Sequence, residues 1–442
     1  MKLRGLIIAA AVLAVLLGVL RWSNRHMPEE NALATPSPSE APPKILTLNE
    51  GDINKLELKK KSGEIVLTKG SDNKWQITAP GTLAVDQSAV SGMLTSVSSL
   101  NSERLVDEKA LNLAQYGLAA PALEVAVTDK SNSQHKLLIG DDTPTGNAAY
   151  AKLDGDARVF TIASFTKSEL DKSLNDLRDK RLLTVDANKI SRLELAVKQQ
   201  NLEFGRDKDQ WQIVKPRPVR ADGTKIDELV RKLTEARMEV GADTDDAKTA
   251  AAFAAGSPIA TAKVTTDAGV QQLEVRKDKD DYYAKSSVVD GVFKVASDLG
   301  QALDKKLDDF RNKKLFDFGV NDPAKIEIRD GTKTYFLTKG GDDWWNSEGK
   351  KFEKVGAEAL LNDLRDLQAT DFAESGFTST ALEITVTPAE GKTVEKVFLS
   401  KGSKNTIAKR EGDQTLYLLD ANAIETLQKL AGDLKTEPAS AK

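Results

Sequence analysis

The chain has 442 residues, a formal net charge of −4, 40% hydrophobic residues and no cysteine. A chain of this length usually folds into about three domains. The lack of cysteine excludes disulfides, thiol catalysis and cysteine-ligated metals, and the acidic balance argues against a nucleic-acid partner.

The N-terminal segment is predicted to anchor the protein in a membrane. Residues 5–22 are apolar except for Arg21, and the run is just long enough to cross the hydrocarbon core as a helix. Two basic residues precede it, which favours a cytoplasmic N-terminus. A cleaved signal peptide is the alternative, although its best cleavage site, Ala32-Leu33-Ala34, lies far beyond the apolar run. We expect residues 1–27 to be a cytoplasmic stub and anchor, with the body outside the cytoplasm.

A proline-rich stretch follows the anchor. Five prolines lie between residues 28 and 43, among Ser, Thr, Glu and Ala. Such a composition gives a semi-extended chain with no means of packing. We therefore predict a linker over residues 28–52.

The rest of the chain repeats one pattern three times. In each copy a tryptophan follows two short alternating apolar segments, at Trp75, Trp211 and Trp345. Each stands eleven residues before the residue expected to start a helix, namely Asp86, Asp222 and Gly356. A period of about 130 residues is typical of an array of similar units. We predict repeat domains over 53–183, 184–316 and 317–435, and a disordered tail over 436–442.

Each copy divides into two halves, each a run of short alternating strands followed by a helix. Turns rich in Asn, Asp and Gly predict hairpins, and hence antiparallel sheets. The six helices are expected to begin at Asp86, Thr166, Asp222, Ser297, Gly356 and Asp420. Thr166 is expected to cap its helix, with Phe165 packing on Leu170. The fold class is therefore α+β: a transmembrane helix, then three copies of short antiparallel sheets covered by helices.

The adjacent tryptophans Trp344 and Trp345 must face opposite sides of a strand. The distance from the next helix assigns Trp345 to the core, as for Trp75 and Trp211. Trp344 then faces outward, where an exposed indole would need a neighbouring unit or an external partner.

The loop Gly140–Asn147 is the most distinctive local feature. Its carboxylates and hydroxyls could hold a cation or bind sugar hydroxyls, through Asp141, Asp142, Thr143 and Thr145. The alternative is a turn-rich hairpin loop, because no Glu closes it at EF-hand spacing. We expect Asp141 and Asp142 not to be catalytic. Together with Trp344, these four residues form the candidate contact surface.

Two basic segments, 177–183 and 310–316, follow predicted helices. They are interpreted either as cations that complement a helix dipole or as a docking strip for an acidic partner. No motif for nucleotide binding, nucleophilic catalysis or zinc hydrolysis is present, and only two histidines occur. We expect no catalytic residues, cofactor or metal.

Several of these features together resemble the bacterial domain-of-unknown-function family 4340. They are the anchor with its proline-rich stretch, Trp75-Gln76-Ile77, Tyr116-Gly117-Leu118 with Pro121, the hairpin 139–151 and Leu177-Arg178-Asp179-Lys180-Arg181. The resemblance is clearest over 53–183. It implies an envelope protein of unknown activity, often encoded beside ABC-transporter components similar to those linked to gliding motility. It carries over no catalytic residues.

Three functions are compatible with the sequence. The first is a non-enzymatic, single-pass protein of the bacterial inner membrane whose extracytoplasmic body binds or scaffolds a membrane protein, as an accessory of an ABC-type transporter or envelope assembly. The second is an envelope polysaccharide-binding protein that contacts glycan through Trp344 or the 140–147 loop. The third is a hydrolase that uses paired carboxylates.

Overall fold

The computed structural model describes residues 43–241, 246–389, 393–402 and 404–438. The chain divides into two compact units, the first ending at Asp179 and the second beginning at Lys180. The expected anchor, residues 1–27, lies outside the described residues, as does most of the expected linker. Within the described ranges, no helix has the length and apolar character needed to cross a membrane.

The first unit contains the first copy, built on a nine-stranded sheet. In spatial order the strands are β5 (Leu83–Ala84), β4 (Trp75–Ala79), β3 (Gly63–Lys69), β2 (Ile53–Lys60), β8 (Leu123–Asp129), β9 (Gln134–Asp142), β10 (Ala148–Leu153), β11 (Val159–Ala163) and β7 (Arg104–Asp107). A separate pair joins β1 (Lys44–Thr47) and β6 (Ser99–Asn101). The helices are α2 (Gln87–Ser98), α3 (Ser164–Leu170) and α4 (Leu174–Leu177), with 3-10 turns η1 (Glu50–Asp52) and η2 (Leu113–Tyr116).

The second unit contains the second and third copies. The second copy has strands β14 (Gln210–Lys215), β13 (Gln200–Asp207), β12 (Arg192–Val197), β15 (Ser257–Thr266), β16 (Gly269–Asp278), β17 (Asp281–Ser286) and β18 (Phe293–Val295) in spatial order. Its helices are α5 (Gly223–Thr234), α6 (Asp246–Ala255) and α7 (Ser297–Leu303), with turns η3 (Ala187–Lys189) and η4 (Leu307–Asp309).

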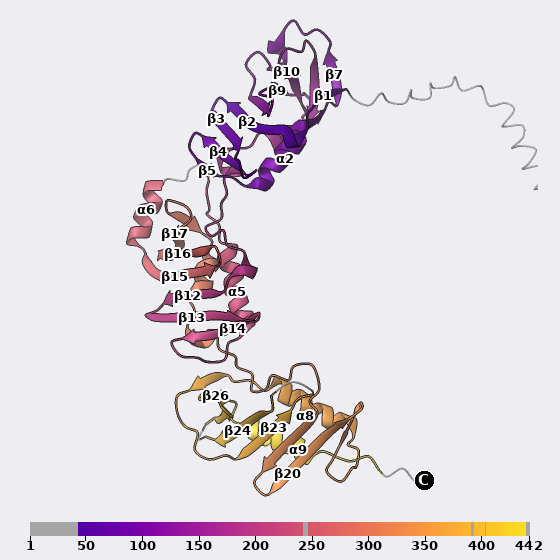
Figure 1. Cartoon of the computed structure of the whole chain (residues 1–442), viewed down its shortest axis with the longest axis vertical. Coiled ribbons are helices and arrows are strands. Elements are labelled where there is room, and N and C mark those ends of the chain that lie inside the picture. The colour runs from indigo at the N-terminus through magenta and orange to yellow at the C-terminus, as the bar shows by residue number, and fades with distance from the viewer. Residues whose placement is uncertain (1–42, 242–245, 390–392, 403, 439–442) are drawn as a thin grey trace, which may run out of the picture. The chain divides into compact units, whose positions relative to one another are not determined.

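The third copy is built in the same way. Its strands are β21 (Asp343–Trp345), β20 (Lys333–Gly340), β19 (Lys325–Asp330), β23 (Leu382–Thr387), β24 (Glu395–Lys401), β25 (Thr406–Arg410), β26 (Leu416–Leu419) and β22 (Asp371–Ala373) in spatial order. Its helices are α8 (Lys354–Asp366) and α9 (Ala423–Gly432). Figure 1 shows the sheet of each copy with its helices.

The three sheets share one strand order, which confirms the predicted repeat. In every sheet, three strands of the first half run outward from the middle and four strands of the second half run the other way; β5 and β7 in the first copy and β22 in the third are additional edge strands. The halves meet where β2 pairs with β8, β12 with β15 and β19 with β23, all antiparallel. The two halves of each copy therefore form one continuous sheet. The α+β class with antiparallel sheets is confirmed.

Each copy has its own apolar core beneath its helices. Alternate strand residues, such as Leu56 and Leu58 or Leu193 and Leu195, point into these cores and are fully buried. The amphipathic helices α5 and α8 close the sheets through apolar residues spaced by three or four positions. Burial of these side chains is the main driving force for each copy.

Of the six predicted helix starts, Asp86 and Asp222 are confirmed as N-caps and Ser297 as the first residue of its helix. Asp86 accepts hydrogen bonds from the N–H groups of Ser88 and Ala89, and Asp222 accepts one from Lys225. The other helices begin at Ser164, Ser297, Lys354 and Ala423, without a side-chain cap. The capping role of Thr166 is wrong, because β11 runs straight into α3 and leaves no loop residue to cap it. Phe165 is accordingly 73% exposed instead of packing on Leu170.

Both ends of the described chain are more ordered than expected. Ile45 and Leu46 on β1 are buried in the first core, so the folded body begins within the predicted linker 28–52. At the other end, Thr436 forms a β-bridge with Phe352, and the Glu437 N–H donates to the Lys351 carbonyl. The predicted tail 436–442 therefore begins with paired residues.

The orientation predicted for the paired tryptophans is wrong. Trp344 is 4% exposed and belongs to the third core, whereas Trp345 is 36% exposed. Trp344 stands opposite Lys339, just as Trp75 stands opposite Lys69 and Trp211 opposite Arg206. The error has a local cause: the residue before α8, Glu353, follows Trp344 by only nine positions, so the eleven-residue spacing of the first two copies does not hold in the third.

Candidate functional site

Within the second unit, the second and third copies are joined along an extended segment, residues 310–317, which we call the junction segment. Its backbone pairs with the loop before α5 and with residues that follow α8. The bonds run from Asp222 N–H to Phe310 O, Asn312 N–H to Arg220 O, Ala369 N–H to Lys313 O and Leu315 N–H to Leu367 O, at 2.8–3.0 Å. The dipole interpretation of these basic residues is wrong, because α7 already ends at Leu303 and only the turn η4 intervenes.

Arg311 fastens the segment to the third copy. It is 6% exposed, and its guanidinium carbon lies 3.5 Å from the centre of the Phe372 ring. Its nitrogens contact the Thr415 hydroxyl at 3.2 Å and the Asp308 carboxylate at 2.9 Å. A buried guanidinium needs such partners, because an unpaired charge in this position would be strongly destabilising.

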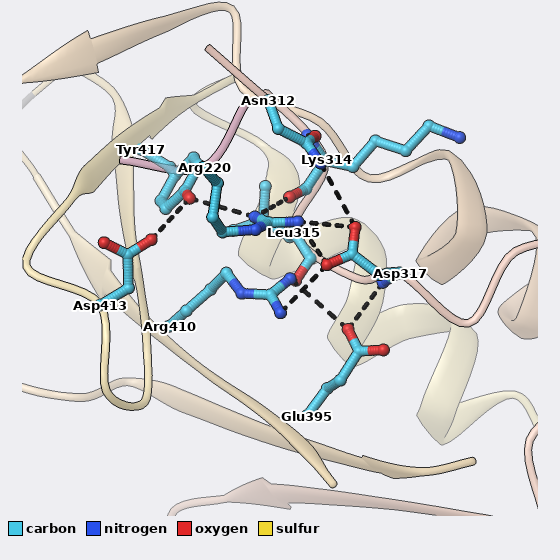
Figure 2. Close-up of polar contacts among 9 residues, drawn as sticks. All are labelled: Arg220, Asn312, Lys314, Leu315, Asp317, Glu395, Arg410, Asp413 and Tyr417. Carbon is cyan, nitrogen blue, oxygen red and sulfur yellow. Dashed lines mark hydrogen bonds and ion pairs between the residues drawn. The ribbon is translucent and has the colours of Figure 1, made fainter. Parts of the chain in front are cut away.

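A second arginine of the second copy, Arg220, reaches the carboxylate of Asp317 (Figure 2). One guanidinium nitrogen contacts both Asp317 oxygens, at 2.6 and 2.5 Å. The other donates to the Lys314 carbonyl at 2.7 Å and to the Tyr417 hydroxyl at 3.1 Å. Burial alone would lower the pKa of Arg220, but Tyr417 and Asp317 more than offset this and raise that pKa above its usual value.

Arg410 approaches Asp317 from the sheet of the third copy (Figure 2). It donates to the Leu315 carbonyl at 2.5 Å and lies 3.3 Å from Asp317 and 3.4 Å from Glu395. Glu395 in turn accepts the Asp317 N–H at 2.6 Å. Burial of Glu395 raises the pKa of its carboxyl; the Asp317 N–H and Arg410 only partly offset this, and the nearby Asp317 carboxylate adds to it.

Tyr417 links this cluster to the β25–β26 turn. Its hydroxyl donates to Asp413 at 2.8 Å while it accepts from Arg220. Burial raises the pKa of Tyr417. Burial would likewise raise the pKa of Asp413, but the Thr415 N–H and the Tyr417 hydroxyl hold it below its usual value. Every charged group in the cluster thus has a partner within the chain.

The cluster borders a groove of about 770 Å³. The groove is lined by polar side chains of the second copy, the junction segment and the third copy, including Gln210, Gln212, Asn312, Asp317 and Asp413. A groove of about 670 Å³, lined by residues 221–225, 308–309, 311–314 and Gln368, also borders the segment. Chemically, the arrangement joins two copies through ion pairs beside solvent-accessible space.

The predicted contact residues belong to different units. Trp344 is buried in the second unit, so it offers no surface. Asp141, Asp142, Thr143 and Thr145 lie in the first unit, at the hairpin between β9 and β10, and both carboxylates are exposed. Two contacts order the loop: Asp142 pairs with Lys167 of α3 at 2.7 Å, and the hydroxyls of Thr143 and Thr145 lie 3.1 Å apart. Within the described ranges, no group of three or more histidine and acidic residues could hold a metal ion.

The charged cluster was not predicted from the sequence. Arg220, Asp317, Glu395 and Arg410 come from four separate segments and match no motif. A usable signal exists only once the copies are aligned residue by residue. The corresponding positions around the start of the second copy are neutral, namely Ala84, Thr184, Gln271 and Ser286, although the counterpart of Arg220 in the third copy is the charged Lys351.

The comparisons with known proteins support the repeat. A family model described as Domain of unknown function (DUF4340) matches residues 75–252 and again residues 211–383. The two matches begin at Trp75 and Trp211, which occupy the same position in successive copies. No curated protein and no solved structure matches the chain.

Proposed function

We propose a function from the premise that the chain belongs to the family of the domain of unknown function DUF4340. The protein is a non-enzymatic scaffold, anchored by a single helix in the bacterial inner membrane, whose extracytoplasmic body binds a membrane protein. The partner is a component of an ABC-type transporter or envelope assembly. One observation carries this proposal: the same sheet occurs three times, each with its own core. Repeated units of this kind distribute binding over an extended surface instead of concentrating chemistry in one cleft.

The polar groups of the junction fit a scaffold better than a catalytic centre. Asp317 is held by two guanidinium groups, and Glu395 accepts a backbone N–H beside Arg410. A catalytic carboxylate must be able to reach a substrate proton or carbon. The ion pairs instead occupy the oxygens that such a reaction would use.

The contact with the partner is assigned to the 140–147 hairpin in the first unit. Its carboxylates are exposed, and its threonine hydroxyls hold one another in place, so a partner would meet a preformed polar surface. Such preorganisation reduces the entropy lost on binding.

The test is co-purification of the tagged full chain from gently solubilised membranes. The matched control carries Asp141→Asn, Asp142→Asn, Thr143→Ala and Thr145→Ala. We expect an integral membrane protein in fixed stoichiometry with the unmodified chain and much less with the control. Equal recovery with both would refute the hairpin as the contact. Retention of the purified chain on envelope glycan without a protein partner, or hydrolysis of that glycan, would overturn the scaffold in favour of a polysaccharide-binding protein or a hydrolase.

A further inference from the structure

The segment that leads into the second copy, residues 182–184, is called here its incoming chain. Neutral groups of the second copy bind this segment. The Ser286 hydroxyl donates to the Leu182 carbonyl. The Thr184 N–H donates to the Gln271 side-chain oxygen at 2.8 Å, and the Gln271 amide donates to the Thr184 hydroxyl at 3.0 Å. These contacts attach the incoming chain to β16 and β17 without any charge.

The third copy makes the same two backbone contacts with charged groups. Arg410 takes the place of Ser286 and donates to the Leu315 carbonyl, while Glu395 takes the place of Gln271 and accepts the Asp317 N–H. The strand register proves the correspondence, because Arg410 pairs with the residue two positions after Glu395, as Ser286 does relative to Gln271.

Two further charges complete the contrast. Asp317 replaces Thr184, and its carboxylate binds the guanidinium of Arg220, whose counterpart in the first copy is Ala84. Joining a copy to its incoming chain does not require charge, since the neutral groups make the same backbone contacts. Partly buried ion pairs are a poor way to gain stability, because desolvation offsets most of their attraction. A different role for these four charges is therefore indicated.

We propose that Arg220, Asp317, Arg410 and Glu395 form a charge-held latch between the second and third copies. The latch opens by release of the junction segment from the third copy while both sheets stay paired, whereas the neutral contact at the start of the second copy stays closed. The four charged side chains belong to neither core cluster, and of the segment's apolar residues Leu315 must leave the third core when its amide is released. Opening also separates Arg311 from Phe372.

Water and ions can reach the latch. The Asp317 side chain keeps 43% of its exposure, and the groove of about 770 Å³ lies against it. Salt shortens the screening length from about 10 Å at 0.1 M to about 3 Å at 1 M, so exposed ion pairs weaken while hydrogen bonds between neutral groups do not. Salt should therefore weaken the charged contact of the third copy and leave the neutral contact of the second copy unchanged.

The experiment measures hydrogen exchange on the full chain at low and high sodium chloride. The reporters are amides that exchange only when the join opens, Leu315 and Ala369. Their counterparts in the same molecule are Leu182 and Met238. We expect exchange at the first pair to accelerate at least about threefold between about 0.1 and 1 M salt, with the second pair unchanged. Amides of the β19–β23 ladder should not respond, because the sheet of the third copy stays paired.

Two variants sharpen the test. Asp317→Asn should accelerate exchange at Leu315 and Ala369 about tenfold at low salt, since Arg220 loses its carboxylate partner and Arg410 loses one of its two. The neutral set Arg220→Ala, Asp317→Thr, Glu395→Gln and Arg410→Ser, copied from the corresponding positions, should abolish the salt response. Equal salt responses at both pairs, no response at either, or acceleration throughout β19–β23 would each overturn the latch. If Asp317→Asn fails to fold, the comparison within the unmodified chain still decides the question.

Discussion

Replacing Trp344 by alanine removes the largest side chain at the outer end of the third core. The residue is 4% exposed and packs in that core, and the Lys339 ammonium lies 5.1 Å from its ring. Truncating a buried tryptophan to alanine typically costs about 3–5 kcal/mol, from lost burial and the cavity that remains. The lost cation–π contact adds about 0.5–1 kcal/mol at a partly exposed site. We expect Trp344→Ala to destabilise the third copy by roughly 4 kcal/mol.

The neighbouring residue supplies the matched control. Trp345 lies on the opposite face, 36% exposed and against Gly340, so Trp345→Ala should cost no more than about 1 kcal/mol. Because the copies have separate cores, one unfolding midpoint would not isolate the effect. Hydrogen exchange of the β19 and β23 amides reports the stability of the third copy directly. The β12 and β15 amides of the second copy serve as an internal reference. If Trp345→Ala costs as much as Trp344→Ala, the assigned strand register is wrong.

Three further substitutions test other parts of the structure. Asp86→Ala should destabilise the first copy by about 1 kcal/mol in denaturant unfolding, because two N–H groups at the start of α2 lose their acceptor. Gly140→Ala should cost more, roughly 2–3 kcal/mol by the same measurement, because its new carbon would lie 2.2 Å from the Tyr116 carbonyl oxygen and force the backbone apart. The raised pKa of Glu395 means that the folded state holds this proton more tightly than the unfolded state, whose value is near 4.5. Its contribution to stability is therefore full below that value and is lost as pH rises through the folded pKa. Glu395→Gln should remove this slope from the pH dependence of third-copy exchange, and an unchanged slope would contradict the assignment.

The confirmed helix caps, Asp86 and Asp222, depend on local sequence patterns that the tertiary structure did not override. Asp86 and Asp222 each lie between the last bridged residue of an extended segment and the first residue of the helix, so their carboxylates can turn back onto the first helical N–H groups, as capping requires. Thr166 had the right chemistry for a cap, but the strand before it continues to Ala163 and fixes where the helix starts. Local propensity therefore located the helix and missed its first turn.

The tryptophan error and the missed cluster have different causes. Counting from Leu337 through Lys339 would have assigned Trp344 to the core, since the apolar residue, the cation and the tryptophan share one face in every copy. The cluster around Asp317 could not be found by any such count. Its members meet only because the strand pairing of the third sheet brings β24 and β25 to the junction segment, and that pairing is a property of the whole fold.

The end of the described chain changes what counts as one repeat. The Glu353 N–H donates to the Lys435 carbonyl and the Glu437 N–H to Lys351, which are the bonds that the second copy makes between its own first half and residues 310–312. The first copy closes in the same way on residues 177–179. In each copy, the segment that follows the second half thus bonds back to the first half of the same copy. Each copy is therefore closed by its own residues, without a neighbour. Gene duplication could copy such a module whole, since every new copy would bring its own closure, and only the few residues that join it to the next would need to evolve afresh.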